Sequence, residues 1–309
     1  MGTIVTVTMN PAVDKTAEAG TLVVGGLNRL ENVVLDAGGK GVNVSKMIAA
    51  LGGDSVATGF LGGSAGVEIE RSLQKLYIKT DFVPVSRQTR TNLKVVDSGG
   101  IVTEFNEPGA DVSPEEFDVL RTKLLGYADP DAIFIFAGSL PRGLDVGAYE
   151  TLINAVKSKG AAVFLDADGE AFRRAINAKP DYVKPNRFEL AQYFGLDEPP
   201  GAMECVVLCK RLIGTGIKLV ALTLGAEGAL FVTGTETLFA PGLPVTALST
   251  VGAGDSMVGA LAYAFDAGLP LREAAALSVA ASAGAVATRG TNPPDRATVE
   301  ELLKQVTFI

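Results

Sequence analysis

The sequence predicts an α/β fold, with a mainly parallel sheet between two layers of helices and a small second sheet beside it. Apolar runs rich in β-forming residues alternate with helical patterns, which is typical of a parallel sheet covered on both faces. These runs span residues 3–8, 55–60, 132–136, 161–165, 182–183 and 218–222. A chain of 309 residues is long enough for one large domain of this kind, and no linker is required.

Capping and composition signals indicate where helices lie. Ser113-Pro-Glu-Glu116 is a capping box with proline at the first helical position, so a helix is expected from there toward Leu125. Residues 256–265 and 272–287 are apolar and rich in alanine, which indicates buried helices.

Two regions depart from the α/β alternation and predict the small sheet. Short alternating stretches occupy residues 21–36 and 89–105, and Ser98-Gly-Gly100 marks a hairpin turn in the second. We expect lid strands within about residues 12–36 and 86–107. Such a lid would cover the carboxyl edge of the main sheet, where open α/β folds bind ligands.

Composition and charge exclude several classes of function. The formal net charge of -8 gives no overall attraction for nucleic acid, so a phosphorylated ligand would need a local basic pocket. The chain has no histidine, which excludes His-ligated metals and Ser-His-Asp catalysis. With no signal-peptide pattern and no run of roughly 18 apolar residues, a cytoplasmic protein without a membrane partner is expected. Cys205 and Cys209 are expected to be small core residues.

Two familiar nucleotide-binding loops are absent. Gly39-Lys40 is followed by Gly41 where a Walker loop needs Ser or Thr. Gly252-Ala-Gly254 has Met257 where a dinucleotide fingerprint needs glycine, which disfavours a dehydrogenase.

The segment Gly252-Ala-Gly-Asp255 runs directly into an expected helix. Its glycines allow backbone N–H groups to converge on an anion, and the helix N-terminus adds its dipole. Such a cradle could hold charge on a phosphoryl group while Asp255 accepts a hydroxyl proton. A simple Asp helix cap explains this segment equally well.

A second glycine-rich segment, residues 36–45, precedes a helix expected over residues 42–51. Its glycines, with Lys40 and Asn43, provide backbone donors, a cation and an amide for a polyhydroxy phosphate. A tight turn alone would explain the glycines but not Lys40 and Asn43.

Polar side chains also occur in the lid and at the end of the first strand. Arg90, Asn92 and Lys94 are spaced two apart, so on a strand they share one face, turned either toward a ligand or toward solvent. Asp14, in Asn10-Pro-Ala-Val-Asp14, could bind sugar hydroxyls or cap a turn.

Two further strand ends carry candidate ligand contacts. Asn186 and Glu189 lie one helical turn apart after Lys184, a spacing that suits hydrated Mg²⁺ and phosphate but also a capping box. Thr223-Leu-Gly-Ala-Glu-Gly228 is a strand-to-turn edge of a common kind.

In this order, N-P-A-x-D, G-G-K-G-x-N-V, K-P-N-x-x-E and G-A-G-D resemble the motifs of the PfkB, or ribokinase-like, carbohydrate kinases, from Asn10 to Gly290. The resemblance implies that residues 1–309 form one ribokinase-like three-layer α/β/α kinase domain with a lid. It also implies ATP and Mg²⁺ as cofactors, a sugar acceptor, and a lid that forms a homodimer in many members.

The same resemblance implies roles for individual positions. Asp255 looks like the catalytic base, and Gly252, Ala253 and Gly254 look like the anion hole. The expected nucleotide contacts are Lys184, Asn186, Glu189, Thr223, Gly225 and Gly228, with Glu189 holding Mg²⁺ through water. The expected sugar contacts are Asp14, Gly38, Gly39, Lys40, Asn43, Arg90, Asn92 and Ser139.

Within the family, Gly26-Leu-Asn-Arg29, Thr89-Arg-Thr-Asn-Leu-Lys94 and Asn106-Glu-Pro-Gly109 look most like the kinases of phosphorylated ketohexoses. The expected reaction converts fructose 1-phosphate to fructose 1,6-bisphosphate. Tagatose 6-phosphate and fructose 6-phosphate are alternative acceptors, and a non-catalytic sugar-phosphate sensor is an alternative of another class. Arg142 departs from the pattern because many relatives have proline there; it either contacts phosphate or faces solvent.

Overall fold

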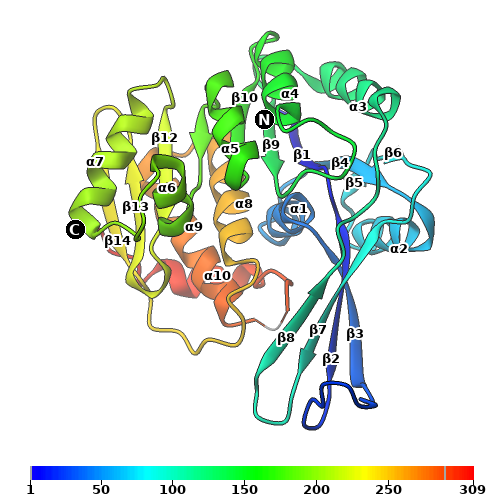
Figure 1. Ribbon diagram of the computed structural model, residues 1–309. Helices are drawn as coiled ribbons and strands as arrows, with labels where there is room; N and C mark the ends of the chain where they lie inside the picture. The colour runs from blue at the N-terminus through cyan, green and yellow to red at the C-terminus, as the bar shows by residue number, and fades with distance from the viewer. Residues whose placement is uncertain (1, 289) are drawn as a thin grey trace.

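The computed structural model, which describes residues 2–288 and 290–309, contains a large sheet flanked by helices and a separate four-stranded sheet (Figure 1). The large sheet has the order β14-β13-β12-β11-β10-β9-β1-β4-β5, and β6 pairs with β4. Its pairs are parallel except at one edge, where β12, β13 and β14 run antiparallel. The strands are β1 (Ile4–Thr8), β4 (Val56–Leu61), β5 (Lys79–Thr80), β6 (Val83–Pro84), β9 (Ile133–Ala137), β10 (Ala162–Asp166), β11 (Tyr182–Val183), β12 (Leu219–Thr223), β13 (Gly228–Val232) and β14 (Thr237–Pro241).

All six strand runs expected from the sequence are present, each within one residue of its expected bounds. The central strands are buried along their whole length, as parallel strands covered on both faces must be. The sequence reading missed β5 and β6, which are two residues long, and the hairpin of β13 and β14.

Helices cover both faces of the large sheet. One core packs Leu120 of α3, Leu152 of α4 and Cys209 of α7 against inward side chains of the strands. On the other face, Val44 of α1 and Leu261 of α8 pack in a second core. The helices are α1 (Lys40–Ala50), α2 (Gly63–Lys75), α3 (Pro114–Tyr127), α4 (Ala148–Lys157), α5 (Gly169–Ala175), α6 (Arg187–Phe194), α7 (Ala202–Ile213), α8 (Ala253–Asp266), α9 (Leu271–Val286) and α10 (Arg296–Leu303).

Local signals explain several helix boundaries. The capping box that begins α3 at Ser113 is present, with both of its hydrogen bonds. Cys205 and Cys209 are buried free cysteines of α7, as expected for core residues. Helix α8 begins at Ala253, three residues before the expected start, because Gly252 adopts a left-handed conformation (φ 83°) and serves as the N-cap.

The small sheet has the order β3-β2-β7-β8 and projects from the main body as a lid (Figure 1). Its strands are β2 (Ala12–Glu18), β3 (Glu31–Gly38), β7 (Arg90–Val96) and β8 (Val102–Asn106). The predicted hairpin joins β7 to β8, where the side chain of Asp97 accepts hydrogen bonds from the N–H groups of Gly99 and Ile101.

One part of the lid prediction was wrong: residues 21–30 form a loop, not a strand. The side chain of Asn28 accepts a hydrogen bond from the N–H of Val23 at 2.8 Å and donates one to its carbonyl at 2.9 Å. These bonds close a turn around Gly25 and Gly26 before β3 begins.

No helix in the described part of the chain is long and apolar enough to span a membrane.

Candidate active site

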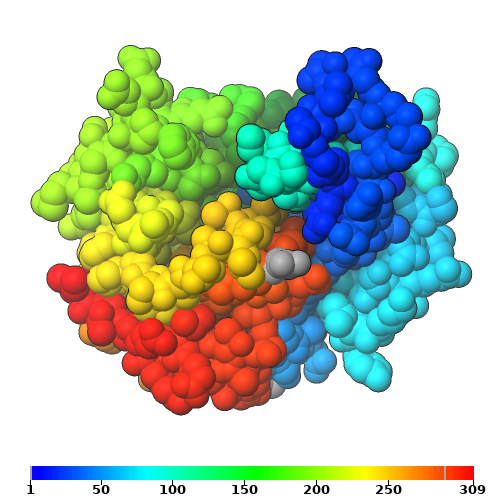
Figure 2. Space-filling view, turned by 90° about the horizontal axis from the view of Figure 1, so that it is seen from below, coloured from blue at the N-terminus to red at the C-terminus, as the bar shows by residue number. Residues whose placement is uncertain are grey.

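A cavity of about 1280 Å³ lies where the carboxyl ends of the main strands face the lid. Figure 2 shows the molecule hollowed between the lid, in blue and teal, and the yellow and orange segments of the C-terminal half. Every site residue expected from the sequence lines this cavity except Gly38. A Cβ atom at Gly38 would lie 2.4 Å from Oδ2 of Asp14, so this glycine lets the backbone pass close to that carboxylate.

The lid turns one row of polar side chains toward the cavity. Asp36, Asp14, Asn92 and Asn106 are register partners across β3, β2, β7 and β8. Asn92 donates a hydrogen bond to Oδ1 of Asp14 at 3.0 Å. The next row on this face includes Lys94, so the predicted alternation of polar residues along β7 is present.

Arg90 lies at the base of the lid with its guanidinium tied to the backbone. It donates to the carbonyl oxygens of Asn10 at 3.0 Å and Glu107 at 3.2 Å. Arg29 and Arg142 are exposed and do not line the cavity, so Arg142 faces solvent.

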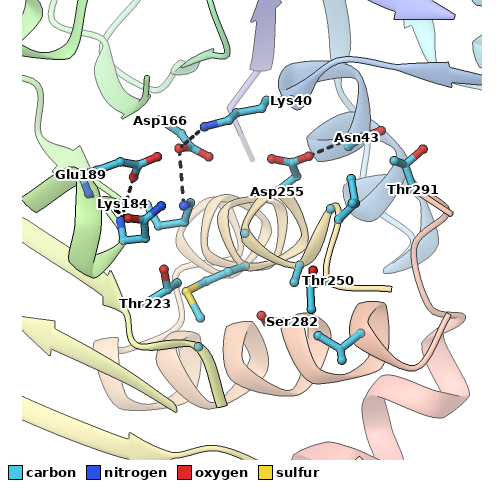
Figure 3. Close-up of a pocket in the computed structure, with 18 of the residues that line it drawn as sticks. Lys40, Asn43, Asp166, Lys184, Glu189, Thr223, Thr250, Asp255, Ser282 and Thr291 are labelled. Carbon is cyan, nitrogen blue, oxygen red and sulfur yellow. Dashed lines mark hydrogen bonds and ion pairs between the residues drawn. The ribbon is translucent and has the colours of Figure 1, made fainter. Parts of the chain in front are cut away.

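Asp255 lies in the first turn of α8 and is 7% exposed. It is not the helix cap, since Gly252 occupies that position without a side-chain hydrogen bond. Its Oδ2 instead accepts a hydrogen bond at 2.8 Å from Asn43 of α1, which is 212 residues away in sequence (Figure 3).

Burial raises the pKa of Asp255 to about 6, and the neighbouring Asp166 acts in the same direction. The hydrogen bond from Asn43 and the charges of Lys40 and Lys184 oppose this rise. A carboxylate with a pKa near 6 is ionised at neutral pH and is a stronger base than an ordinary aspartate.

Asp166, at the end of β10, is a central residue of the cavity that the sequence reading missed. Its Oδ1 lies 3.1 Å from Nζ of Lys40 and 3.4 Å from Nζ of Lys184 (Figure 3). Burial alone would raise its pKa, but the two lysines hold that pKa below the usual value. The available signal was a carboxylate directly after the apolar run at residues 161–165.

Lys40, the first residue of α1, lines the cavity from the main body of the protein. Burial disfavours its charge, but Asp166, Glu189 and Asp255 together raise its pKa above the usual value. The ammonium is therefore charged and lies between the end of β10 and the N-terminus of α8.

Asn186 and Glu189 form the capping box that the sequence left as an alternative to a metal site. The side chain of Asn186 accepts from the N–H of Glu189, and Oε2 of Glu189 accepts from the N–H of Asn186, both at 2.8 Å. Burial raises the pKa of Glu189, and its side chain still lines the cavity.

The described residues contain no group of three or more acidic or cysteine side chains placed to bind a metal. Oδ2 of Asp166 is buried without a hydrogen-bond partner, and Glu189 lines the same cavity. This donor set fits Mg²⁺, which usually keeps several waters and binds one or two carboxylates together with substrate phosphates.

The far wall of the cavity follows the end of β12. Thr223 forms an isolated bridge with Asn186, and Gly225 and Gly228 have positive φ angles of 64° and 117°. A Cβ atom at Gly228 would lie 2.0 Å from the carbonyl oxygen of Ala240. Apolar side chains complete this wall: Leu224, Val245, Val251, Val279 and Val286.

Buried polar atoms without a partner concentrate at this cavity. Buried polar groups in folded proteins are nearly always hydrogen-bonded, so unpaired ones mark places where a ligand or water is expected. Within residues 2–288 and 290–309, all such side-chain atoms belong to residues that line the cavity: Thr8, Asn43, Arg90, Asn92, Asp166, Arg187 and Thr291. The cavity therefore suits a large ligand that carries both hydrogen-bond donors and acceptors.

The fold and this cavity are those of a phosphotransferase, in which a buried carboxylate and lysines meet the N-terminus of a helix that has no side-chain cap. The sequence profile of the pfkB family carbohydrate kinases matches residues 7–298, and the chain belongs to this family. It is 37% identical over 300 residues to the 1-phosphofructokinase of Rhodobacter capsulatus, an alignment covering 95% of this chain and 94% of that one.

Solved structures agree with the fold. Phosphofructokinase-2 from Escherichia coli in complex with potassium superposes with a TM-score of 0.94 at 30% identity, covering 99% of both chains. The ribokinase of Thermotoga maritima superposes with a TM-score of 0.81 at 24% identity, covering 98% of this chain and all of that one. The predicted ribokinase-like fold and sugar-kinase class are thereby confirmed, and kinases of this family use ATP as phosphate donor.

Proposed function

We propose that this protein transfers the γ-phosphoryl group of ATP to the free primary hydroxyl of fructose 1-phosphate, giving fructose 1,6-bisphosphate. One observation carries the proposal: Asp255, a buried carboxylate with a pKa raised to about 6, lies at the N-terminus of α8 in a cavity lined with basic side chains. The name of the Rhodobacter relative supports the choice of acceptor.

In the proposed reaction, Asp255 accepts the proton of the sugar hydroxyl as its oxygen attacks the γ-phosphorus. The new P–O bond forms while the bond to the β-phosphate oxygen breaks, and ADP leaves. Backbone N–H groups of residues 252–254, together with Lys40 and Lys184, stabilise the charge on the transferring group.

Magnesium is part of this proposal. Asp166 and Glu189 would hold the ion from the protein side, with waters and nucleotide phosphates as its other ligands. Bound there, it would neutralise charge on the phosphates. The wall formed by Leu224, Val251 and Val286 would contact the flat base of the nucleotide.

The lid supplies the proposed recognition of the acceptor. Asp14 and Asn92 present a carboxylate and an amide to sugar hydroxyls, while Arg90 and Lys94 provide local positive charge in a chain of net charge -8. Charge of this kind favours a sugar that already carries phosphate. Gly39 and Ser139 line the same end of the cavity.

The test is ADP release measured with fructose 1-phosphate, tagatose 6-phosphate, fructose 6-phosphate and unphosphorylated fructose. We expect the highest kcat/KM with fructose 1-phosphate. Fastest turnover of free fructose would contradict the role of the basic lid residues. Tight binding of sugar phosphate without ADP release would favour a sensor instead.

We also propose that the chain works as one kinase domain in the cytoplasm and forms a homodimer through the lid. The lid face opposite the cavity carries a row formed by Leu35, Lys15, Leu93 and Phe105. Leu35 is 55% exposed and Phe105 is 53% exposed. A second copy of this face is the simplest partner for such an apolar surface.

A further inference from the structure

Lys46 is a buried lysine that has no part in the proposed reaction. It lies in α1 and is 4% exposed, although lysines are almost never fully buried unless they are paired. Its ammonium donates a hydrogen bond to the carbonyl oxygen of Ala37, at the end of lid strand β3. A buried cation at the junction of lid and body requires an explanation.

The position of Lys46 along α1 connects it to the active site. Lys40, Asn43 and Lys46 are three residues apart and therefore follow one side of the helix. Lys40 contacts Asp166 and Asn43 contacts Asp255. The third contact, from Lys46 to β3, ties the lid to the helix that also orients the proposed base.

The peptide that Lys46 holds lies beside a sugar-binding candidate. Ala37 precedes Gly38, whose backbone passes so close to Asp14 that a Cβ atom there would lie 2.4 Å from Oδ2 of Asp14. A shift of the end of β3 would therefore move or displace the Asp14 carboxylate.

Carboxylates of the lid and of α8 lie around Lys46 and favour its charged form. Burial lowers the pKa of Lys46, while Asp36 and Asp14 of the lid and Asp255 of α8 oppose that change. Asp36 also accepts a hydrogen bond at 3.3 Å from Asn292, which lies next to the cavity-lining Thr291.

We propose that Lys46 is a positioning residue that holds Asp14 at the place, relative to Asp255, where the acceptor sugar must bind. This inference rests on the proposed function, because it concerns the acceptor of that reaction. The proposed ATP contacts at the other end of the cavity do not depend on Lys46.

The test compares the wild type with Lys46→Met, which keeps the length of the side chain and removes its charge. We expect the KM for the sugar phosphate to rise about 10-fold or more, because a small misplacement of a binding group is costly. The Kd for ATP should change less than about twofold, since the donor contacts are separate. Lys304→Met, at the exposed C-cap of α10, is the matched control and should leave both constants unchanged.

The outcomes separate the two proposals. A wild type that releases no ADP with any sugar phosphate contradicts the proposed function. An active wild type, with a Lys46→Met variant whose acceptor KM is unchanged, overturns the role of Lys46. A rise in both the acceptor KM and the ATP Kd also overturns it, because general loosening of the fold would then explain the effect.

If Lys46→Met does not fold, the variant Asp36→Asn tests whether Lys46 positions Asp14. Asp36 is only partly buried, so its amide is tolerated sterically and removes one carboxylate that stabilises the ammonium. We expect a rise in acceptor KM of about twofold to fivefold, smaller than for loss of the cation itself, with unchanged ATP affinity. An unchanged acceptor KM in this variant would overturn the proposal.

Discussion

Asp255 is the residue on which the proposed chemistry depends most directly. Replacing it with Asn keeps its shape and its contact with Asn43 but removes the base, so kcat should fall by about 10²–10⁴-fold. Steady-state ADP release measures the loss, and unchanged ATP affinity serves as the control. Near-normal turnover by a folded variant would show that another group accepts the proton.

The same substitution should raise thermal stability at alkaline pH. The pKa of Asp255 is higher in the folded protein than the usual aspartate value, so its contribution to stability decreases as pH rises through about 6. Asp255→Asn should therefore melt above the wild type at pH 8, with the difference shrinking toward pH 4. A lower melting temperature at pH 8 would argue against a burial cost at this position.

The pH profile of kcat offers an independent check on Asp255. Because the carboxylate works in its ionised form, kcat should fall on the acid side of a pKa of about 6. Asn43→Ala removes a hydrogen bond that lowers this pKa, so the acid limb should move to higher pH. An acid limb near the ordinary aspartate pKa of about 4 would contradict this assignment.

Asp166 is expected to matter for stability as well as catalysis. Asp166→Asn would leave Lys40 and Lys184 close together without their shared counter-charge. Breaking a buried ion pair in this way should lower the free energy of unfolding by about 3 kcal/mol, measured by denaturant titration. The exposed Asp197→Asn is the control, and equal stability of the two variants would refute the pairing.

At this scale the sequence predicted which residues line the cavity better than what they contact. Asp255 was identified, but its own segment left base and helix cap as equal alternatives, because its partner Asn43 is 212 residues away. The Asn186–Glu189 pair was identified too, and its capping box is present. Asp166 was missed because its two partners come from distant parts of the sequence. Lys40 lies in α1 and Lys184 follows β11, and only the folded sheet brings them to Asp166.

Among the elements, α1 and α8 make an unusually close pair. A Cβ atom at Gly259 of α8 would lie 2.9 Å from Cβ of Met47 and 3.0 Å from the carbonyl oxygen of Val44. The two helices carry Asn43 and Asp255, so this approach sets the contact between the amide and the proposed base. Glycine is required here by packing, in spite of its poor helix propensity.

Gly259→Ala should therefore destabilise the protein. Alanine favours a helix by about 1 kcal/mol over glycine, but overpacking a tight contact costs about 1–3 kcal/mol. We expect a lower melting temperature and a reduced kcat. Gly126→Ala in α3 is the control: no atom lies within 4 Å of its added Cβ, so that variant should be as stable as the wild type or more so. An equal rise in melting temperature for Gly259→Ala and Gly126→Ala would refute the packing argument.

Element boundaries show where local signals suffice. Buried parallel strands read as continuous apolar runs, and the capping box of α3 is local, so both were predictable. The loop at residues 21–30 was read as part of a strand because it belongs to the short alternating stretch over residues 21–36, whereas the side-chain turn at Asn28 keeps it as a loop. The hairpin of β13 and β14 was missed because its start overlaps the turn after β12.

For the whole molecule, the lid proposal makes a direct prediction. The protein should sediment as a dimer, and Phe105→Glu should yield monomers because a charge would be buried in the apolar lid face. Met203→Glu in α7 is the control, since Met203 is 83% exposed but lies outside the lid. A monomeric wild type, or a dimer unaffected by Phe105→Glu, would rule out this interface.

The unpaired polar atoms around the cavity have a consequence for the resting protein. Groups such as Asp166 Oδ2 and Thr291 Oγ1 lack protein partners, so a bound ligand can offer them hydrogen bonds that the fold itself does not supply. A ligand that satisfies them would stabilise the fold by about 2.7 kcal/mol at a concentration 100 times its Kd. Substrate supply would then regulate how long the enzyme survives in the cell, with idle molecules the first to unfold and be degraded.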